Sequence, residues 1–140
     1  MTMLVVFESM FGNSEAVARA IADGLGEDAV VAATDDATPA LVASATLIVA
    51  GCPVHNWGLP SQKSHATAER FGDTDSIPPA SSDTMPMRDW LAAVPAGSGR
   101  VAAFDTRYDS RFAGSASKEI LKELVATGRE QADEPQAFHV

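Results

Sequence analysis

Small polar residues and a glycine directly follow the first apolar run of the chain. Ser9 and Ser14 stand at the two ends of this stretch, with Gly12 and Asn13 inside it, and it contains no lysine or arginine. Backbone N–H groups at the start of a helix carry about half a positive charge and bind anions, and hydroxyl and amide groups add donors. The stretch is therefore suited to a phosphate, and the alternative is a capped turn that binds nothing.

A second stretch, residues 51–60, carries Trp57 among loop-forming residues. A tryptophan in a loop is either a buried anchor or a flat face offered to a planar ligand. Cys52 is a candidate nucleophile, but a Cys-x5-Arg phosphatase loop needs a basic residue near Leu59, and none is present there. The sequence therefore favours a small buried residue at Cys52.

A third stretch, residues 105–114, offers an acidic and an aromatic side chain. Asp105 is able to accept from the ring N–H groups of a bound heterocycle, and Tyr108 is able to stack on its face. The alternative for Asp105 is a surface ion pair with Arg107 or Arg111. If the fold brings the three stretches together, the functional interpretation of each one is favoured over its structural alternative.

Alternating strand and helix patterns must position these stretches. We expect strands at residues 3–7, 29–33, 45–50, 100–104 and 136–140. We expect helices from residue 16 to 25, capped by Asn13 or Ser14, and at 38–42, 61–70, 87–94 and 116–127, with a Pro/Ser/Asp-rich loop at 72–86. This alternation predicts one α/β domain over residues 1–140, with a doubly wound parallel sheet. In such sheets, ligands bind beyond the carboxyl ends of the strands.

Composition and charge narrow the partners. The chain has 140 residues, a formal charge of −9 and one cysteine. The negative charge disfavours nucleic acid and anionic membrane and favours a partner with a basic docking face, although acidity also serves plain solubility. The absence of a disulfide, of a long apolar run and of a signal-peptide pattern at the N-terminus predicts a cytoplasmic location. No metal site is expected, because the three histidines are scattered along the chain.

Together, these motifs resemble the flavodoxin family. Residues 9–14, Ser-Met-Phe-Gly-Asn-Ser, are similar to the family's phosphate loop, Ser/Thr-x-Thr-Gly-Asn-Thr, with Phe11 in place of a hydroxyl residue. Residues 51–58 resemble the family's Gly-x-x-Thr-Trp-Gly loop with two extra residues. Residues 105–114 resemble its Asp-Ser-x-Tyr and Phe-x-Gly loop.

The resemblance implies a five-stranded parallel sheet in the order 2-1-3-4-5 and an FMN cofactor. It places the FMN phosphate at the first stretch. It places the isoalloxazine ring at the second and third stretches, between Trp57 and Tyr108. The implied cofactor-binding residues are Ser9, Met10, Phe11, Gly12, Asn13 and Ser14 for the phosphate, and Pro53, Val54, His55, Asn56, Trp57, Gly58, Asp105, Thr106, Arg107, Tyr108 and Phe112 for the ring.

One departure from the family concerns the end of the sequence. Flavodoxins carry a last helix after the fifth strand, which covers one face of the sheet, and this sequence ends at Val140. An apolar face left in water costs about 25 cal/mol per Å². We therefore expect a homodimer through this face, a docked partner element or lowered stability.

Three functions are consistent with these features. The first is an FMN-binding electron carrier, which needs no catalytic side chains of its own because the flavin carries the redox chemistry. The second is an FMN-dependent NAD(P)H or quinone oxidoreductase, which needs room for a second ring above the flavin. The third is an interaction domain that keeps the scaffold without binding flavin. A basic redox partner protein is expected for the first function.

Overall fold

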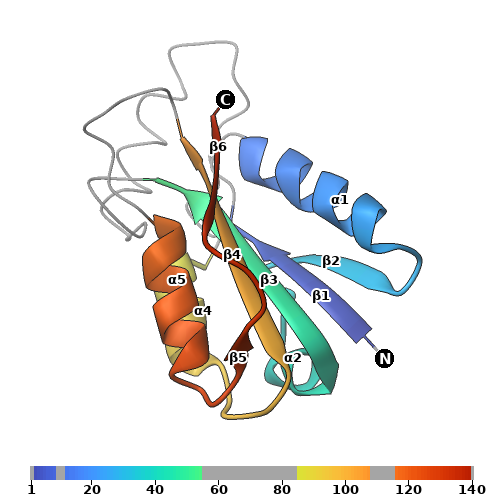
Figure 1. Cartoon of the computed structure of the whole chain (residues 1–140), viewed down its shortest axis with the longest axis vertical. Coiled ribbons are helices and arrows are strands. Elements are labelled where there is room, and N and C mark those ends of the chain that lie inside the picture. The colour runs from blue at the N-terminus through green and yellow to red at the C-terminus, as the bar shows by residue number, and fades with distance from the viewer. Residues whose placement is uncertain (1, 9–11, 55–84, 108–115, 140) are drawn as a thin grey trace.

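Apolar strands form the centre of the molecule. The computed structural model describes residues 2–8, 12–54, 85–107 and 116–139. The first four strands are β1 (Thr2–Phe7), β2 (Ala29–Ala33), β3 (Ala45–Pro53) and β4 (Arg100–Arg107). They pair in parallel in the order β2-β1-β3-β4, so β1 and β3 are central and rich in fully buried valine, leucine and isoleucine. Their carboxyl ends point to the top of Figure 1.

Two short strands share the fifth place in the sheet. β5 (Glu130–Gln131) pairs in parallel with the first half of β4, and β6 (Gln136–His139) pairs in parallel with its second half. The order β2-β1-β3-β4-β5 confirms the predicted sheet, with β6 as a sixth strand along the same edge. The sequence predicted only the second of these two segments, because two residues are too few to show a strand period.

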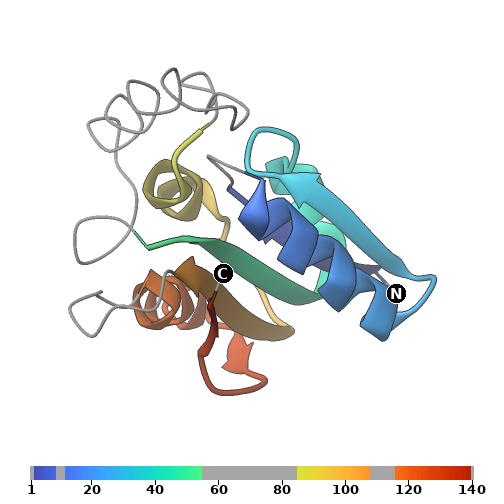
Figure 2. The same cartoon turned by 90° about the horizontal axis from the view of Figure 1, so that it is seen from above.

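Helices cover the two faces of the sheet unequally. α1 (Asn13–Leu25) packs on one face, over Val5, Val49 and Phe104. The other face carries α2 (Pro39–Ser44), α4 (Met87–Ala93) and α5 (Ala116–Val125), whose apolar side chains pack against Leu4, Val6 and neighbouring strand residues. Figure 2, which looks down from the top of Figure 1, shows the sheet edge-on between α1 and the α4–α5 pair. None of the helices in the described ranges is long and apolar enough to cross a bilayer.

An aromatic side chain of β6 is partly exposed beside the face that carries α1. Phe138 meets Phe104 edge to face, with 6.1 Å between ring centroids, and is 38% exposed. On both faces of β4 the neighbouring side chains are buried, Phe104 and Thr106 on one face and Ala103 and Asp105 on the other. The homodimer expected through the face that carries α1 stays a prediction.

Several boundaries and faces differ from the sequence-based expectation. β3 continues to Pro53, which pairs in register with Thr106 of β4, and β4 continues to Arg107, which pairs with His139 of β6. α1 starts at Asn13 and its N-cap is Gly12, not Asn13 or Ser14, since the left-handed backbone at Gly12 (φ 88°) turns the chain into the helix.

Helical spacing of apolar residues predicts inward faces for two helices, and each needs one correction. The predicted inward residues are Val17, Ala20, Ile21 and Leu25 for α1, and Ile120, Leu121, Leu124 and Val125 for α5. Ala20 of α1 is exposed, and Ala18 and Ala22 are buried instead. Val125 at the end of α5 is 40% exposed, because the helix ends there and the chain turns away. The other predicted inward residues of α5 are buried. The helix expected at residues 61–70 lies outside the described residues.

Candidate functional site

The carboxyl ends of β1, β3 and β4 lie side by side, so the three predicted stretches start from one edge of the sheet. The backbone N–H of Glu8 donates to the carbonyl of Gly51 over 3.0 Å. The N–H of Val54 donates to the carbonyl of Thr106, also over 3.0 Å. These two bonds link the point where each strand ends to its neighbour. The structure therefore confirms that the three stretches leave the sheet at adjacent positions.

The start of α1 has backbone N–H groups that the helix itself does not satisfy. Within the described ranges no side chain caps this helix, and its first intrahelical backbone bond runs from Ala16 N–H to Gly12 carbonyl. The N–H groups of Asn13, Ser14 and Glu15 therefore have no acceptor within the helix. A Cβ built on Gly12 meets no atom within 4 Å. This geometry fits a phosphate held by backbone N–H groups without any basic side chain.

The hydroxyl of Ser14 is turned into the protein. Its Oγ lies 3.0 Å from Oγ1 of Thr106, and both side chains are almost fully buried. This bond joins the first turn of α1 to the end of β4, and so the first predicted stretch to the third. Asn13 is exposed beside it. The Ser14 hydroxyl is therefore engaged inside the protein, whereas Asn13 lies at the surface.

Two carboxylates lie buried at this edge, on the face that carries α4 and α5. Glu8 and Asp105 are each 0% exposed. Oε1 of Glu8 accepts from the backbone N–H of Met87 at the start of α4, and Oδ2 of Asp105 accepts from the N–H of Ser117 over 2.9 Å in α5. The buried position of Asp105 contradicts its alternative as a surface charge. Its side chain instead links the end of β4 to the start of α5 through this hydrogen bond.

Cys52 lies between these carboxylates on the middle strand. Its thiol is fully buried, and burial, with the nearby negative charges of Glu8 and Asp105, raises its pKa well above the ordinary value. A thiol with a raised pKa holds little thiolate at neutral pH and reacts slowly. The structure therefore supports the buried interpretation of Cys52 over the nucleophile.

Polar residues after β2 also belong to this edge, and the sequence analysis did not single them out. Oγ1 of Thr34 donates to the carbonyl of Met85 over 2.6 Å, and Oδ1 of Asp35 accepts from the N–H of Met85 over 2.8 Å. The signal available was a run of polar residues directly after an apolar strand. These two side chains hold the point at which the described chain resumes after residues 55–84.

The predicted ring-binding residues are only partly described. Pro53 lies at the end of β3, Val54 follows it, and Asp105, Thr106 and the backbone of Arg107 lie on β4 rather than in a loop. The remaining predicted residues lie outside the described ranges: Ser9, Met10, Phe11, His55, Asn56, Trp57, Gly58, Tyr108 and Phe112.

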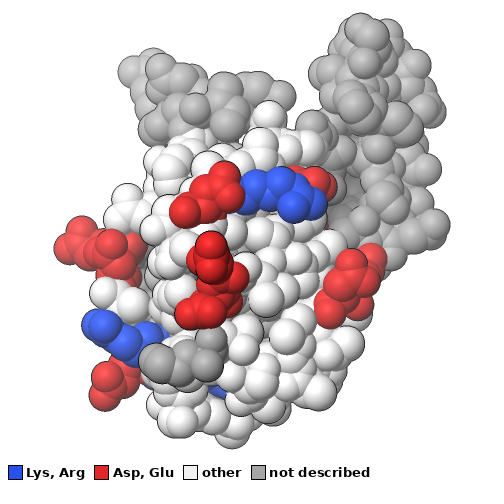
Figure 3. Space-filling view, turned by 90° about the vertical axis from the view of Figure 1, so that its right-hand side faces the viewer, with Lys and Arg blue, Asp and Glu red and all other residues white. Residues whose placement is uncertain are grey.

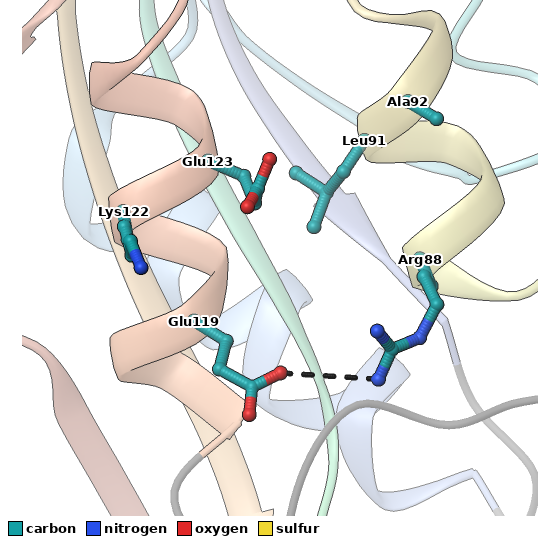
Figure 4. Close-up of a pocket in the computed structure, with 6 residues that line it drawn as sticks. All are labelled: Arg88, Leu91, Ala92, Glu119, Lys122 and Glu123. Atoms are coloured by element: carbon teal, nitrogen blue, oxygen red, sulfur yellow. Dashed lines mark ion pairs between the residues drawn. The ribbon is translucent and has the colours of Figure 1, made fainter.

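The described residues also line a surface cavity between two helices. A space of about 430 Å³ lies between α4 and α5, lined by charged side chains of both signs and by Leu91 and Ala92 (Figure 4). Across it, Arg88 and Glu119 form a loose ion pair of 4.0 Å with both side chains largely exposed. Within the described ranges, no group of three or more His, Cys, Asp or Glu side chains is arranged to hold a metal ion.

Comparisons with known proteins agree with this geometry. The sequence model of the flavodoxin family matches residues 5–127. No curated protein sequence matches the chain significantly. Among solved structures, a flavodoxin from the domain Archaea superposes with a TM-score of 0.67 at 23% identity, over 99% of this chain and 84% of its own. A Streptococcus pneumoniae TIGR4 flavodoxin gives 0.68 at 19% identity, over 100% and 86%. Oxidised Flavodoxin 2 from Bacillus cereus gives 0.68 at 16% identity, over 100% and 85%.

The structural similarities show the fold, and the family match spans most of the chain. Members of the matched family bind FMN, and family and fold together support an FMN-binding role in electron transfer in broad terms. The strand order and the convergence of the three stretches are what this assignment requires of the structure. This chain belongs to the flavodoxin family.

Proposed function

We propose that this protein is an electron carrier that binds one FMN at the carboxyl ends of β1, β3 and β4. The observation that carries the proposal is the start of α1, whose first N–H groups have no acceptor within the helix, held at the end of β4 by the Ser14–Thr106 hydrogen bond. An anion site and an adjacent strand end are what a phosphorylated planar cofactor needs. FMN supplies reversible uptake and release of electrons when it is bound.

Each group of residues has a distinct part in holding the cofactor. Backbone N–H groups of Asn13, Ser14 and Glu15 bind the phosphate, with the exposed amide of Asn13 as a further donor. The backbone at Val54 and Thr106 lies at the two strand ends from which the ring-binding stretches continue. The buried negative charges of Glu8 and Asp105 oppose further negative charge at this edge and so favour the less reduced cofactor.

The surface charge supports a basic redox partner. On the side of the molecule shown in Figure 3, acidic side chains are spread over α1 and the turns before and after β2. The described acidic residues of these segments are Glu15, Asp23, Glu27, Asp28, Asp35 and Asp36. The basic residue among them, Arg19, is paired with Glu15 over 3.1 Å. Such a field attracts a basic partner and speeds its encounter at low salt.

Titration of the purified protein with FMN tests the proposal. We expect FMN fluorescence to be quenched on binding and the visible flavin bands to shift. Riboflavin, which lacks the phosphate, is the matched control ligand and should bind more weakly, because the start of α1 then has no anion to hold. A protein that shows neither flavin bands nor quenching in this titration is not a flavin-binding carrier.

Steady-state consumption of NADH or NADPH separates a carrier from an oxidoreductase. A carrier loaded with FMN oxidises neither nucleotide at an appreciable rate, with or without a quinone, but passes electrons to cytochrome c once it has been reduced chemically. Sustained turnover of NADPH with a quinone by the loaded protein would instead establish the enzyme.

A further inference from the structure

β2 forms one outer edge of the sheet. Among the described strands it has β1 as its only neighbour, and Figure 2 shows it at the end of the sheet away from β4. It pairs with β1 in unbroken register, from Met3 opposite Ala29 to Phe7 opposite Ala33. A strand at the edge of a sheet presents backbone N–H and C=O groups on its outer side, and these groups are able to pair with a further strand.

The hydrogen bonds at the two ends of β2 show which of its backbone groups face outward. The carbonyl of Asp28 accepts from the N–H of Met3 over 3.3 Å, and the N–H of Thr34 donates to the carbonyl of Phe7 over 3.0 Å. Backbone groups alternate in direction along a strand, so the even-numbered residues of β2 face β1 and the odd-numbered residues face outward. The turns at the two ends use two of the outward groups, the N–H of Ala29 and the carbonyl of Ala33. The other outward groups are the carbonyl of Ala29, the N–H and carbonyl of Val31 and the N–H of Ala33.

β2 lacks the features that usually protect the edge of a sheet. Its residues read Ala-Val-Val-Ala-Ala, with no charged side chain and no proline, and its register against β1 contains no bulge. Val30 is 41% exposed, although valine is among the residue types most often buried. This edge therefore offers outward backbone groups and an exposed apolar side chain to an extended segment.

Acidic residues lie at both ends of this edge. Glu27 and Asp28 directly precede β2, Asp35 and Asp36 follow it after one residue, and all four are exposed. No lysine or arginine occurs from residue 20 to residue 62 of the sequence. The field at both ends of the edge is therefore negative, and it attracts a segment with basic residues at its ends.

The same charges oppose the pairing of β2 with a second copy of this chain. A two-fold axis between two edge strands makes them antiparallel, so the residues before β2 in one copy would meet the residues after β2 in the other. Acidic side chains would then face acidic side chains at both ends of the pair, which is unfavourable. The occupant that fits this edge is therefore a different protein.

We propose that β2 is a docking edge for an extended segment of a partner protein, which adds to the sheet as a further strand. The segment has a β-branched, apolar centre beside Val30 and has lysine or arginine at both ends, next to the acidic residues that flank β2. Backbone bonds to Val31 and Ala33 supply the affinity, and the charged ends supply the selectivity. The interaction needs no cofactor, so it does not depend on the proposed FMN function.

A synthetic peptide tests the proposal. The probe carries the sequence Val-Thr-Val-Thr-Val with two lysines at each end, and amide hydrogen exchange of the full chain follows its binding at low salt. We expect exchange at the N–H groups of Val31 and Ala33 to slow several-fold. Exchange at Val30 and Ala32 should stay nearly unchanged, because their N–H groups already face β1. The same peptide with proline in place of its central valine should not bind, because proline disrupts a strand.

Three outcomes of this experiment overturn the proposal. The first is that the peptide does not bind. The second is that it binds without the alternating protection of Val31 and Ala33. The third is that the same amides are protected in the protein alone as its concentration rises, which would place a second copy of the chain on β2.

Substitution of Val31 by proline tests the backbone contacts. Val31→Pro removes an outward N–H and leaves the groups that face β1 in place, so it should abolish binding of the peptide. Thermal unfolding checks that this variant is folded. Full binding by folded Val31→Pro would contradict strand addition at β2.

A pair of triple variants tests the charge selectivity. Glu27→Gln, Asp28→Asn, Asp36→Asn should weaken peptide binding about tenfold at low salt, as for the loss of three exposed ion pairs. The control variant Glu123→Gln, Glu130→Gln, Glu134→Gln removes the same charge from exposed positions on α5 and around β5, near the opposite edge of the sheet. It should bind nearly as well as the wild type. Equal weakening in both variants would show that net charge alone attracts the peptide, and it would overturn the proposal.

Discussion

Ser14 and Thr106 are 92 positions apart in the chain, and their hydroxyl oxygens lie 3.0 Å apart in the buried contact between α1 and β4. Ser14 belongs to the stretch proposed to bind the phosphate, and Thr106 belongs to the strand that leads into one of the two stretches proposed to bind the ring. A single side-chain hydrogen bond therefore couples two parts of the proposed cofactor site. Because both groups are buried, each depends on the other for its partner.

Thr106→Val should destabilise the apoprotein by about 1–3 kcal/mol, because it leaves the Ser14 hydroxyl buried without this partner. Ser14→Ala together with Thr106→Val should cost less than the sum of the two single changes, since the double variant leaves no orphaned hydroxyl. Urea unfolding of the wild type, the two single variants and the double variant gives the coupling free energy between Ser14 and Thr106. Thr46→Val is the control: its hydroxyl bonds to the carbonyl of Thr2 at the surface, and the change should stay within about 0.5 kcal/mol. Additive losses at Ser14 and Thr106 would contradict this coupling.

Gly51→Ala should destabilise the protein through a steric clash. A Cβ at Gly51 would lie 2.3 Å from the outer ring atoms of Phe104, so the phenyl ring or the end of β3 must move. Forcing a methyl group into such a contact costs about 1–3 kcal/mol. Gly51→Ala with Phe104→Leu should regain part of this loss in thermal unfolding, because the smaller side chain vacates the space.

Gly24→Ala is the matched change with the opposite expected sign. Gly24 lies inside α1, and a Cβ there meets no atom within 4 Å. Alanine favours the helix over glycine by about 0.5–1 kcal/mol. Equal effects of the two glycine substitutions would show that backbone entropy, and not contact with Phe104, determines the outcome at Gly51.

The thiol of Cys52 should make stability depend on pH in the alkaline range. Its pKa is raised in the folded protein, first by burial and then by Glu8 and Asp105. Above the thiol's pKa of about 8.5 in the unfolded chain, the unfolded state releases a proton that the folded state keeps. Stability is therefore complete below that pH and declines above it, by about 1.4 kcal/mol per pH unit, until the folded pKa is reached.

Cys52→Ala removes this contribution and serves as the comparison. The difference in unfolding free energy between wild type and Cys52→Ala should be constant below about pH 8 and should shrink at higher pH. Alkylation of the wild-type thiol by iodoacetamide should follow global unfolding. Rapid alkylation of the folded protein at neutral pH would show that the thiol is neither buried nor protonated.

The sequence predicted those parts of the fold that depend on local pattern. The strands at residues 29–33 and around residues 3–7 and 45–50 were evident from apolar runs, and the helix at 38–42 from Thr38 before Pro39. Strand ends were predicted too short. β3 extends to Pro53 because Pro53 pairs with Thr106 of β4, and β4 extends to Arg107 because Arg107 pairs with His139 of β6. These partners are distant in the sequence, so no local pattern reveals them.

The sequence predicted where the candidate site lies in the fold, but it did not predict the hydrogen bonds within the site. The convergence of the three stretches followed from topology, which a repeating strand and helix pattern determines. The bonds from Thr34, Asp35 and Glu8 to residues 85–87 join segments about 50 to 80 positions apart, and no local pattern marks such partners. The Gly12 cap was missed for a related reason, since glycine at this place has no side chain to signal a cap.

The acidic residues near the cofactor edge should steer a basic electron acceptor. Glu15 lies in the first turn of α1, and Asp35 and Asp36 directly follow β2, so all three are close to the carboxyl ends of the strands. The triple variant Glu15→Gln, Asp35→Asn, Asp36→Asn removes their charge, and the asparagine at position 35 keeps an acceptor for Met85. We expect the association rate with cytochrome c, measured by stopped-flow mixing with the reduced, FMN-loaded protein, to be several-fold lower for the triple variant than for the wild type at low ionic strength.

The acidic residues at the other end of the same side provide the control. The control triple variant changes Asp23, Glu27 and Asp28, which lie near the end of α1 and before β2, to the corresponding amides. Both variants lose the same net charge, so a purely global effect slows both equally. If the acidic residues steer the partner toward the cofactor edge, association is slowed more in the first variant than in the control. This difference between the two association rates disappears at high salt, because the Debye length falls to about 3 Å at 1 M. Equal rates for the two variants at low salt would place the encounter surface elsewhere on the protein.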